Sequence, residues 1–291
     1  MKNWLKNISD ETLLCNINIP GTHNSCACFI DFPYFSKCQN LTIKEQLEIG
    51  IRFFDLRIEA KNGEVKTVHS ILSCRKKKFS RKKLTVDDVL FDITSFLKEN
   101  TTETVLLCVK RDNGVSPEET YRIFFERYVK NNDLFFTENR IAALGEVRGK
   151  TVLINRCEVG KFTDLTSGLN LSNWPDQTNF DNSTEKENII IKKDGLQRNT
   201  GYFLQDFYTL PKKQKWQKAI LPAIENAHLH KDIVINFFSA NNGFSSPKMY
   251  KKYIYRKFDS VKLKKRQKYG WIILDFPEKE VTEKIINSNF M

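Results

Sequence analysis

The sequence predicts an irregular (β/α)8 barrel of the TIM type, built as one α/β domain from residues 1–291. Eight short apolar runs have the length and composition of buried strands, and amphipathic helical segments fill most of the intervals between them. A chain of 291 residues has an ordinary length for one such barrel. No internal repeat and no linker-like composition divides the chain, so a single domain is expected.

The order of the expected elements follows from the same patterns. Strands are expected at residues 13–19, 51–59, 67–72, 104–109, 151–157, 202–208, 232–239 and 270–276. Helices are expected at residues 41–50, 85–100, 117–130, 212–230, 246–268 and 278–287. The interval between the second and third strands is too short for a crossover helix, so the barrel is expected to be irregular. The polar segment 160–200 is expected to be a long loop.

The composition is strongly basic. The formal net charge is +12, and 40% of the residues are hydrophobic. Such a charge attracts phosphate groups on nucleic acid, on anionic lipid or on a phosphorylated substrate. The basic residues are spread over many expected helices without a nucleic-acid motif, so no nucleic-acid partner is expected. No sequence feature indicates a protein partner.

The seven cysteines and the start of the chain bear on the compartment. The cysteines contain no Cys-x-x-Cys pair, and several lie in apolar runs where a free thiol behaves as a small hydrophobe. This favours a reducing compartment. The start lacks the apolar segment of a signal peptide, and no run of about 18 apolar residues is present. We therefore expect a cytoplasmic or peripheral membrane protein, with export by another route left open.

Two segments fit either a structural or a membrane-binding interpretation. Residues 3–12 carry Trp4, Leu5 and Ile8 on one side, as in a helix that closes a barrel end or in an interfacial anchor. Residues 75–83 contain seven cations and one phenylalanine. Such a loop is either an ordinary solvated surface or a docking loop, drawn to anionic lipid by about 1 kcal/mol per basic residue.

His23 is the first candidate catalytic residue. The apolar run 13–19 is interpreted as a buried strand, and Pro20-Gly21 is expected to end it in a turn. His23 is therefore expected at a strand end, where it can exchange protons near neutral pH or serve a purely structural role.

Three further candidates lie on the next two strands. Asp55 and Arg57 are two residues apart, so they share one face of the strand 51–59. If that face points into the barrel, an acid and a cation enter the interior together. A structural ion pair would explain the same spacing. The third expected strand carries His69.

Four short segments then occur in one order along the chain: Pro20-Gly21-Thr22-His23, Phe54-Asp55-Leu56-Arg57, Val68-His69 and Gly270-Trp271-Ile272-Ile273-Leu274-Asp275. Two more are Trp174-Pro175-Asp176 and Gln205-Asp206-Phe207-Tyr208. In order and spacing, over almost the whole chain, these segments resemble the bacterial phosphatidylinositol-specific phospholipase C family, the X-domain barrel. Each motif is short, but together they are specific.

The resemblance implies metal-independent cleavage of phosphatidylinositol in a membrane surface, with diacylglycerol and inositol 1,2-cyclic phosphate as products and no cofactor. It implies that His23 takes the proton of the inositol 2-hydroxyl, that Arg57 binds the phosphate and that His69 protonates the departing oxygen. Asp275 would orient His23. In-line displacement at phosphorus needs such a base, acid and cation. The residues implied to hold the inositol ring are Lys110, Arg156, Asp206 and Tyr208, the last as a stacking face.

Two residues depart from the family pattern. Asn24 stands where the family usually has an aspartate, and Ser70 follows His69 where glycine is usual. An amide cannot raise the pKa of an imidazole as a carboxylate does. We therefore expect weakened general-acid catalysis, unless Asp55 takes over the role of the missing carboxylate.

Asn24 also resembles the calcium-dependent eukaryotic relatives, in which an asparagine after the first histidine binds calcium. Calcium takes about six to eight oxygen ligands, several of them from carboxylates. Arg57 and Lys110 occupy the strand positions that would supply such ligands, so no metal is expected.

Two other function classes stay open. A metal-dependent glycerophosphodiesterase or a sphingomyelinase-D-like enzyme would need clustered carboxylates, but only Asp55 and Glu59 lie near Arg57. A catalytically impaired barrel that binds phosphoinositide or membrane is suggested by Asn24 and by the basic segment 75–83. The retention of both candidate histidines speaks against it.

Overall fold

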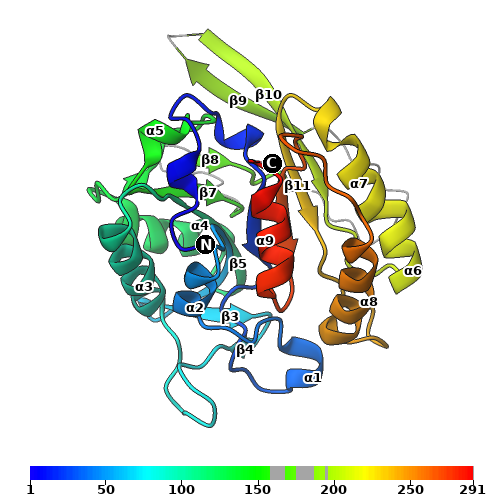
Figure 1. The fold of residues 1–291 in the computed structure, drawn as a ribbon. Coiled ribbons are helices and arrows are strands. Elements are labelled where there is room, and N and C mark those ends of the chain that lie inside the picture. Colours follow the sequence, from blue (N-terminus) through cyan, green and yellow to red (C-terminus); the bar gives the residue numbers. More distant parts are fainter. Residues whose placement is uncertain (158–167, 175–186, 194–195, 291) are drawn as a thin grey trace.

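The computed structural model describes residues 1–157, 168–174, 187–193 and 196–290 (Figure 1). The strands are β1 (Ile19–Thr22), β2 (Phe53–Lys61), β3 (Glu64–His69), β4 (Leu72–Ser73), β5 (Val105–Gly114), β6 (Phe135–Phe136), β7 (Thr151–Asn155), β8 (Leu169–Asn170), β9 (Glu187–Lys193), β10 (Leu196–Gln205), β11 (Ile233–Phe237) and β12 (Trp271–Leu274). The α-helices are α1 (Pro33–Ser36), α2 (Ile43–Glu48), α3 (Val86–Glu99), α4 (Pro117–Phe124), α5 (Leu144–Val147), α6 (Lys212–Gln214), α7 (Leu221–Asn226), α8 (Pro247–Asp259) and α9 (Lys279–Asn287).

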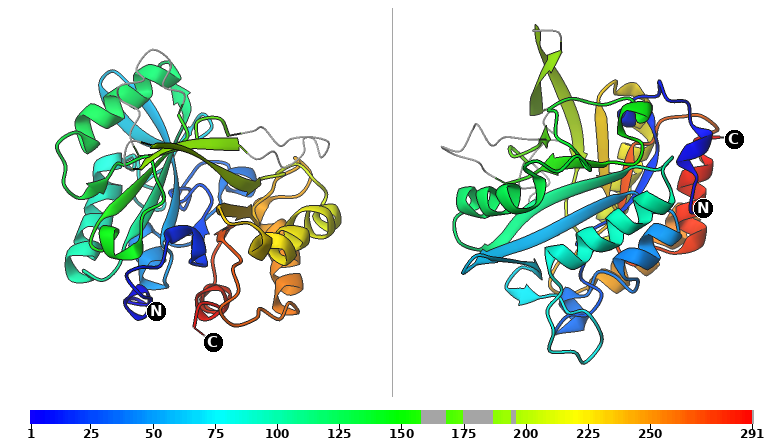
Figure 2. Two further views of the ribbon diagram at one scale, coloured as in Figure 1. Left: turned by 90° about the horizontal axis from the view of Figure 1, so that it is seen from above. Right: turned by 90° about the vertical axis from the view of Figure 1, so that its left-hand side faces the viewer.

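One sheet contains strands from both ends of the chain. Its strands follow the order β6-β7-β5-β2-β1-β12-β11-β10-β9, and β1 pairs in parallel with both β2 and β12. The sheet curls, and helices cover its outer side (Figure 2). Within the described residues no ladder joins β7 or β8 to β10, so the barrel is open at that point. The predicted irregular TIM-type α/β barrel is confirmed.

Alternating residues of the strands face two different cores. Phe53, Leu106 and Ile273 point into the barrel and belong to one apolar cluster. Phe54 belongs to a second cluster, with side chains of α2 and α3, and Ile272 to a third, with side chains of α8 and α9. Because side chains alternate along a strand, every second residue of a barrel strand points into the barrel, up to the end of the strand.

The first strand differs from the prediction. Leu14–Asn16 forms a 3₁₀ turn, and β1 begins at Ile19 and continues through Pro20-Gly21. The expectation that these two residues end the strand was wrong. A Cβ atom on Gly21 would lie 2.7 Å from side-chain atoms of both Ile273 and Phe53, so glycine allows β1 to pass between its two neighbours.

The third expected strand is not one of the parallel strands of the barrel. β3 runs antiparallel to β2, joined by Asn62 and Gly63 with φ values of 53° and 73°. Two residues with positive φ form the tight turn that suits a hairpin. The short interval read from the sequence is therefore a hairpin turn that carries His69 away from the barrel wall.

The helix predictions agree with the structure except at the end of one helix. A capping box formed by Thr42 and Glu45 begins α2, within the helix expected at 41–50. The helix expected at 246–268 ends at Asp259. Part of the expected loop 160–200 lies outside the described residues, and the described part contains β8, β9 and the start of β10.

The N-terminal segment closes the barrel end. Trp4 and Leu5 are buried, and the indole N–H of Trp4 donates to the carbonyl oxygen of Gly50 at 3.0 Å. The alternative of a membrane anchor at Trp4 was wrong. All seven cysteines are buried free thiols. Among the described helices, none has the length and apolarity that crossing a bilayer requires.

Candidate active site

The predicted site residues gather at the carboxyl ends of the barrel strands. His23 directly follows β1, Arg156 directly follows β7 and Asp275 directly follows β12, while Arg57 and Lys110 lie within β2 and β5. Each continues the inward-facing set of its own strand. Catalytic residues of such barrels occupy this end, because loops there can be shaped without disturbing the core.

A cavity of about 750 Å³ opens at this end. Eight of the ten predicted residues line it: His23, Arg57, His69, Lys110, Arg156, Asp206, Tyr208 and Asp275. The other two are fully buried, and the backbone N–H of Asn24 donates to Asp55 Oδ2 at 3.0 Å. The structure therefore brings all ten predicted positions into one neighbourhood.

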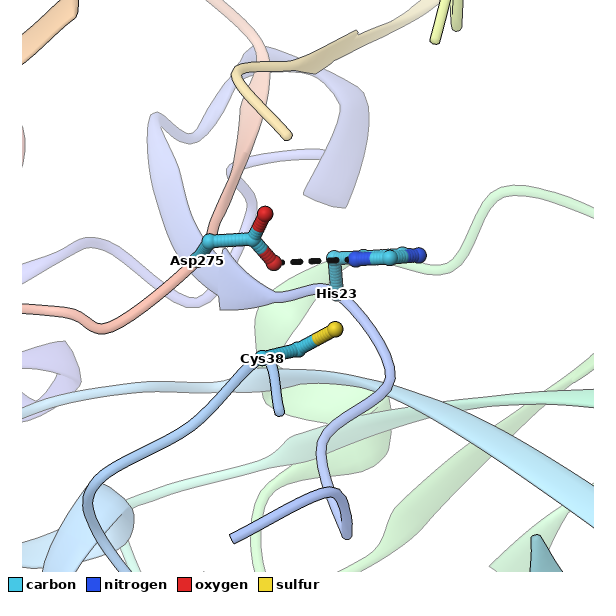
Figure 3. A group of neighbouring side chains, drawn as sticks. All are labelled: His23, Cys38 and Asp275. Atoms are coloured by element: carbon cyan, nitrogen blue, oxygen red, sulfur yellow. Dashed lines mark hydrogen bonds and ion pairs between the residues drawn. The ribbon is translucent and has the colours of Figure 1, made fainter. Parts of the chain in front are cut away.

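His23 is held by a carboxylate. Its Nδ1 lies 2.9 Å from Asp275 Oδ1, and a dashed line marks this contact in Figure 3. Asp275 is buried, and burial raises the pKa of its carboxyl group while His23 opposes that shift. With Nδ1 as the donor, the neutral ring keeps its lone pair on Nε2. The dyad therefore presents a nitrogen that can accept a proton.

His69 is held differently. Its Nδ1 lies 2.7 Å from the carbonyl oxygen of Ser36, and its ring centroid lies 6.3 Å from that of His23. Burial, followed by the charge on His23, lowers the pKa of His69 to about 4. Among the described residues no carboxylate lies within ion-pair distance of His69. The His69 ring is therefore neutral near neutral pH.

Arg57 lies between two carboxylates. Its Nε and Nη2 each lie 3.0 Å from Asp55 Oδ2, and its Nη1 lies 3.3 Å from Asp112 Oδ1. Burial opposes ionisation of Asp55, but Arg57 and Arg156 outweigh it and lower the pKa of that carboxyl group. Asp55 therefore anchors two guanidinium groups. The alternative that it replaces the missing carboxylate beside His69 finds no support in these contacts.

Asp112 is a site residue that the sequence did not reveal. The β2–β5 ladder shifts register after the pair Ile58 and Arg111 and resumes at Glu59 and Asn113, so Asp112 is the extra residue of a β-bulge. Its carboxylate accepts from Arg57, from Lys110 at 3.2 Å and from the backbone N–H of Ser70 at 2.9 Å. The bulge thus joins β2, β5 and the His69 hairpin.

Another part of the cavity wall is aromatic and charged. Arg156 lies over the Trp174 ring, 3.5 Å from its centroid, and its Nη1 lies 3.4 Å from Asp55 Oδ1. The Trp174 indole donates to Asp206 Oδ2 at 3.3 Å. Tyr208 is 38% exposed at the same cavity. This wall offers cations, an acceptor and aromatic faces to a polar ring.

Asn24 occupies an unusual position. Its φ is 44°, and its side chain is fully buried. Neither its amide nitrogen nor its amide oxygen has a hydrogen-bond partner within the described part of the chain. A buried amide without a partner costs free energy.

Cys38 is a second residue that the sequence analysis missed. It is fully buried, it contributes to the cavity wall, and its sulfur lies 3.9 Å from His69 Nδ1. Sequence spacing gave no signal for it, because the loop containing Cys38 reaches His23 only through the tertiary fold.

Comparisons with known proteins agree with this geometry. A family model described as PI-PLC X 1 matches residues 11–146. A 1-phosphatidylinositol phosphodiesterase of Listeria monocytogenes is 26% identical, over 99% of this chain and 85% of its own length. The enzyme of the same name from Staphylococcus aureus strain Newman is 25% identical, over 99% of this chain and 94% of its own length.

Solved structures of phosphatidylinositol-specific phospholipase C share the fold. The Listeria monocytogenes structure aligns with a TM-score of 0.73 at 23% identity, over 100% of this chain and 99% of its own. A double mutant of the Staphylococcus aureus enzyme aligns with a TM-score of 0.81 at 23% identity, over 100% and 97%. In the matching segment, in the relatives aligned over nearly the whole chain and in the common fold, this chain is therefore similar to the bacterial phosphatidylinositol-specific phospholipases C.

Proposed function

We propose that this protein is a phosphatidylinositol-specific phospholipase C, which cleaves phosphatidylinositol into diacylglycerol and inositol 1,2-cyclic phosphate without a metal ion. One observation carries the proposal. Two histidines with their rings 6.3 Å apart share a cavity with Arg57, and each has its Nδ1 already bonded, so both Nε2 atoms are left for chemistry. The names of the full-length relatives support the same substrate.

In this proposal His23 is the general base. Its Nε2 takes the proton of the inositol 2-hydroxyl as that oxygen attacks phosphorus. Asp275, 2.9 Å from Nδ1, keeps the ring in the required tautomer and stabilises the imidazolium that forms. The intramolecular attack gives a five-membered cyclic phosphate and needs no water in the first step.

Arg57 stabilises the phosphate in the transition state. Its guanidinium is fixed by Asp55 and Asp112, so its position does not depend on the substrate. A cation that is already oriented loses little free energy when negative charge develops on the phosphate oxygens. Lys110, 3.2 Å from Asp112, adds a second cation to the same cluster.

His69 is the general acid in this scheme, and it must gain a proton first. Burial and nearby positive charge disfavour the imidazolium and lower the pKa of His69 to about 4. A phosphodiester beside Arg57 brings a negative charge, which raises the pKa of His69. Substrate binding thereby charges the acid that protonates the diacylglycerol oxygen.

The substrate would be reached at a membrane surface. Large apolar side chains are exposed around this end of the barrel: Phe32, Tyr34, Phe35, Ile71, Phe79, Phe244 and Met249. Ile71 follows the cavity residue Ser70, and cavity residue Asn241 donates to the Phe35 carbonyl. The basic segment 75–83 lies at the same end as α1 and β4 (Figure 1). An apolar rim with a cationic loop suits an anionic bilayer.

The test is release of water-soluble inositol phosphate from phosphatidylinositol vesicles in the presence of a chelator. We expect cyclic inositol phosphate from the wild-type protein and none above background from His23→Ala. Vesicle binding is measured in parallel and is expected to be equal for both proteins. Activity that disappears with the chelator would overturn the metal-independent mechanism.

A second candidate function is favoured by one observation. The buried side chain of Asn24 has no hydrogen-bond partner in the described structure, as in a site that has lost its catalytic adaptation. The chain would then be a phosphoinositide- or membrane-binding module. Vesicle binding by the wild-type protein without any product release would support this function.

A further inference from the structure

Three side chains of different chemistry converge beside the base. His23, Cys38 and Asp275 each offer one ligand atom, and these atoms all lie within 4.8 Å of one another. In Figure 3 the sulfur of Cys38 points toward the hydrogen bond between His23 and Asp275. The three residues come from three separate parts of the chain, and the fold alone brings them together.

We propose that this group is a binding site for one thiophilic divalent cation of the zinc class, held by Cys38 Sγ, His23 Nδ1 and an oxygen of Asp275. The group contains a thiol, an imidazole and a carboxylate, which are the three ligand types that zinc takes in proteins. Cys38 is fully buried and Asp275 is 3% exposed. One Asp275 oxygen, Oδ2, has no hydrogen-bond partner within the described residues.

The distances suit zinc after a small adjustment. Ligand bonds of roughly 2.0–2.3 Å in a tetrahedral site separate neighbouring ligand atoms by about 3.3–3.7 Å. The 2.9 Å between His23 Nδ1 and Asp275 Oδ1 must open slightly, and Cys38 must approach. Hydrogen bonds from two side chains fix the backbone of two of the ligands. The Gln39 amide donates to the His23 carbonyl at 2.6 Å, and the Tyr255 hydroxyl donates to the Asp275 carbonyl at 2.8 Å.

Charge and access also agree with a cation. A thiolate and a carboxylate together balance a divalent ion. The nearby charge of Arg57 is already compensated by Asp55 and Asp112. Cys38, His23 and Asp275 all contribute to the wall of the open cavity, so an ion can enter from solvent and keep one open coordination position there.

Binding would change the tautomer of His23. A neutral imidazole that binds a metal through Nδ1 carries its hydrogen on Nε2. The Nδ1 proton is therefore replaced by one on Nε2, and the thiol proton of Cys38 passes to solvent. The nitrogen that faces the cavity loses its lone pair, and the base is blocked. This inhibitory consequence rests on the proposed function, whereas cation binding itself does not.

Binding is tested without any activity measurement. Cobalt(II) replaces zinc in such sites and gives a near-ultraviolet charge-transfer band only when a thiolate is a ligand. We expect one cobalt(II) ion per wild-type chain, with a band that added zinc abolishes. Cys38→Ser and Cys38→Ala should both lose the band, and His23→Ala should weaken cobalt binding. Cys157→Ser is the matched control, because Cys157 is also a buried thiol in the cavity wall, and it should keep the band. No band in the wild type, or a band that survives both Cys38 substitutions, would overturn the site.

Inhibition is tested separately on phosphatidylinositol vesicles. Zinc should inhibit the wild-type protein and Cys157→Ser, and inhibition of Cys38→Ala should require at least tenfold more zinc. Calcium and magnesium should not inhibit at the same concentrations. Zinc binding without inhibition would overturn the tautomer argument. If no protein variant turns over substrate, the proposed function fails while the cobalt spectra still decide the cation site.

Discussion

The two histidines of the site differ in the group that their Nδ1 atoms contact. His23 donates to a carboxylate, whereas His69 donates to a backbone carbonyl. A carboxylate favours the imidazolium, whereas burial and nearby positive charge favour the neutral form of His69 despite its hydrogen bond to the Ser36 carbonyl. The comparison indicates that one histidine is prepared to receive a proton, while the other depends on the substrate to acquire one.

The largest effects are expected from removing either ring. His23→Ala and His69→Ala should each lower turnover of phosphatidylinositol by about 10²–10⁴-fold, the usual contribution of acid–base catalysis. An inositol phosphate ester with a nitrophenol leaving group separates them, because that group departs without a proton. His69→Ala should recover much of its loss on this ester, and His23→Ala should not. Equal losses on both substrates would contradict the assigned roles.

The carboxylate beside His23 should come next in size. Asp275→Asn leaves the volume unchanged but removes the charge that stabilises the imidazolium, so we expect kcat to fall on the order of 10²-fold or more. KM should change far less, because Asp275 bonds to His23 rather than to the phosphate-binding cations. Near-normal kcat in this variant would show that the His23 side does not need its carboxylate.

An increase in activity is expected from a substitution that would support His69. Asn24→Asp restores the carboxylate that the family usually has at this position, and the buried amide has no described partner to lose. Activity should rise several-fold. Asn24→Ala is the control, since it removes the unpaired amide without adding charge, and it should give no gain. Unchanged activity in Asn24→Asp would mean that weak support of His69 does not limit turnover.

The smallest effect concerns stability. The unfolded chain protonates His69 below its ordinary pKa of 6.5, but the folded protein resists protonation down to about 4. Between these values the unfolded state binds more protons, so this group lowers the free energy of unfolding as pH falls. His69→Asn keeps a donor for the Ser36 carbonyl but does not titrate. Urea unfolding should therefore give this variant a shallower pH dependence between pH 6.5 and 4. An unchanged slope would contradict the low pKa.

The barrel could be predicted because its strands are visible as apolar runs, and most of the site residues could be named because short segments resemble a known family. The structure places Arg57, Lys110 and Asp275 in the inward-facing rows of their strands. Pro20-Gly21 was misread because a close approach between strands requires glycine for reasons that lie outside the local sequence. Cys38 and the partner of His69, the Ser36 carbonyl, were missed since loop contacts and backbone acceptors have no pattern.

The bulge in β5 adds one carboxylate, that of Asp112, to the active-site cavity without changing the register of the strands before it. Because the ladder between β2 and β5 resumes directly after Asp112, deletion of this one codon would leave the pairing from Phe53 to Ile58 in register. The active-site cavity would lose one carboxylate, and Arg57 and Lys110 would lose the acceptor that they share. Deletion of a single residue, rather than a substitution, would thus be enough to convert a phosphate pocket whose cations are paired with Asp112 into a more cationic one.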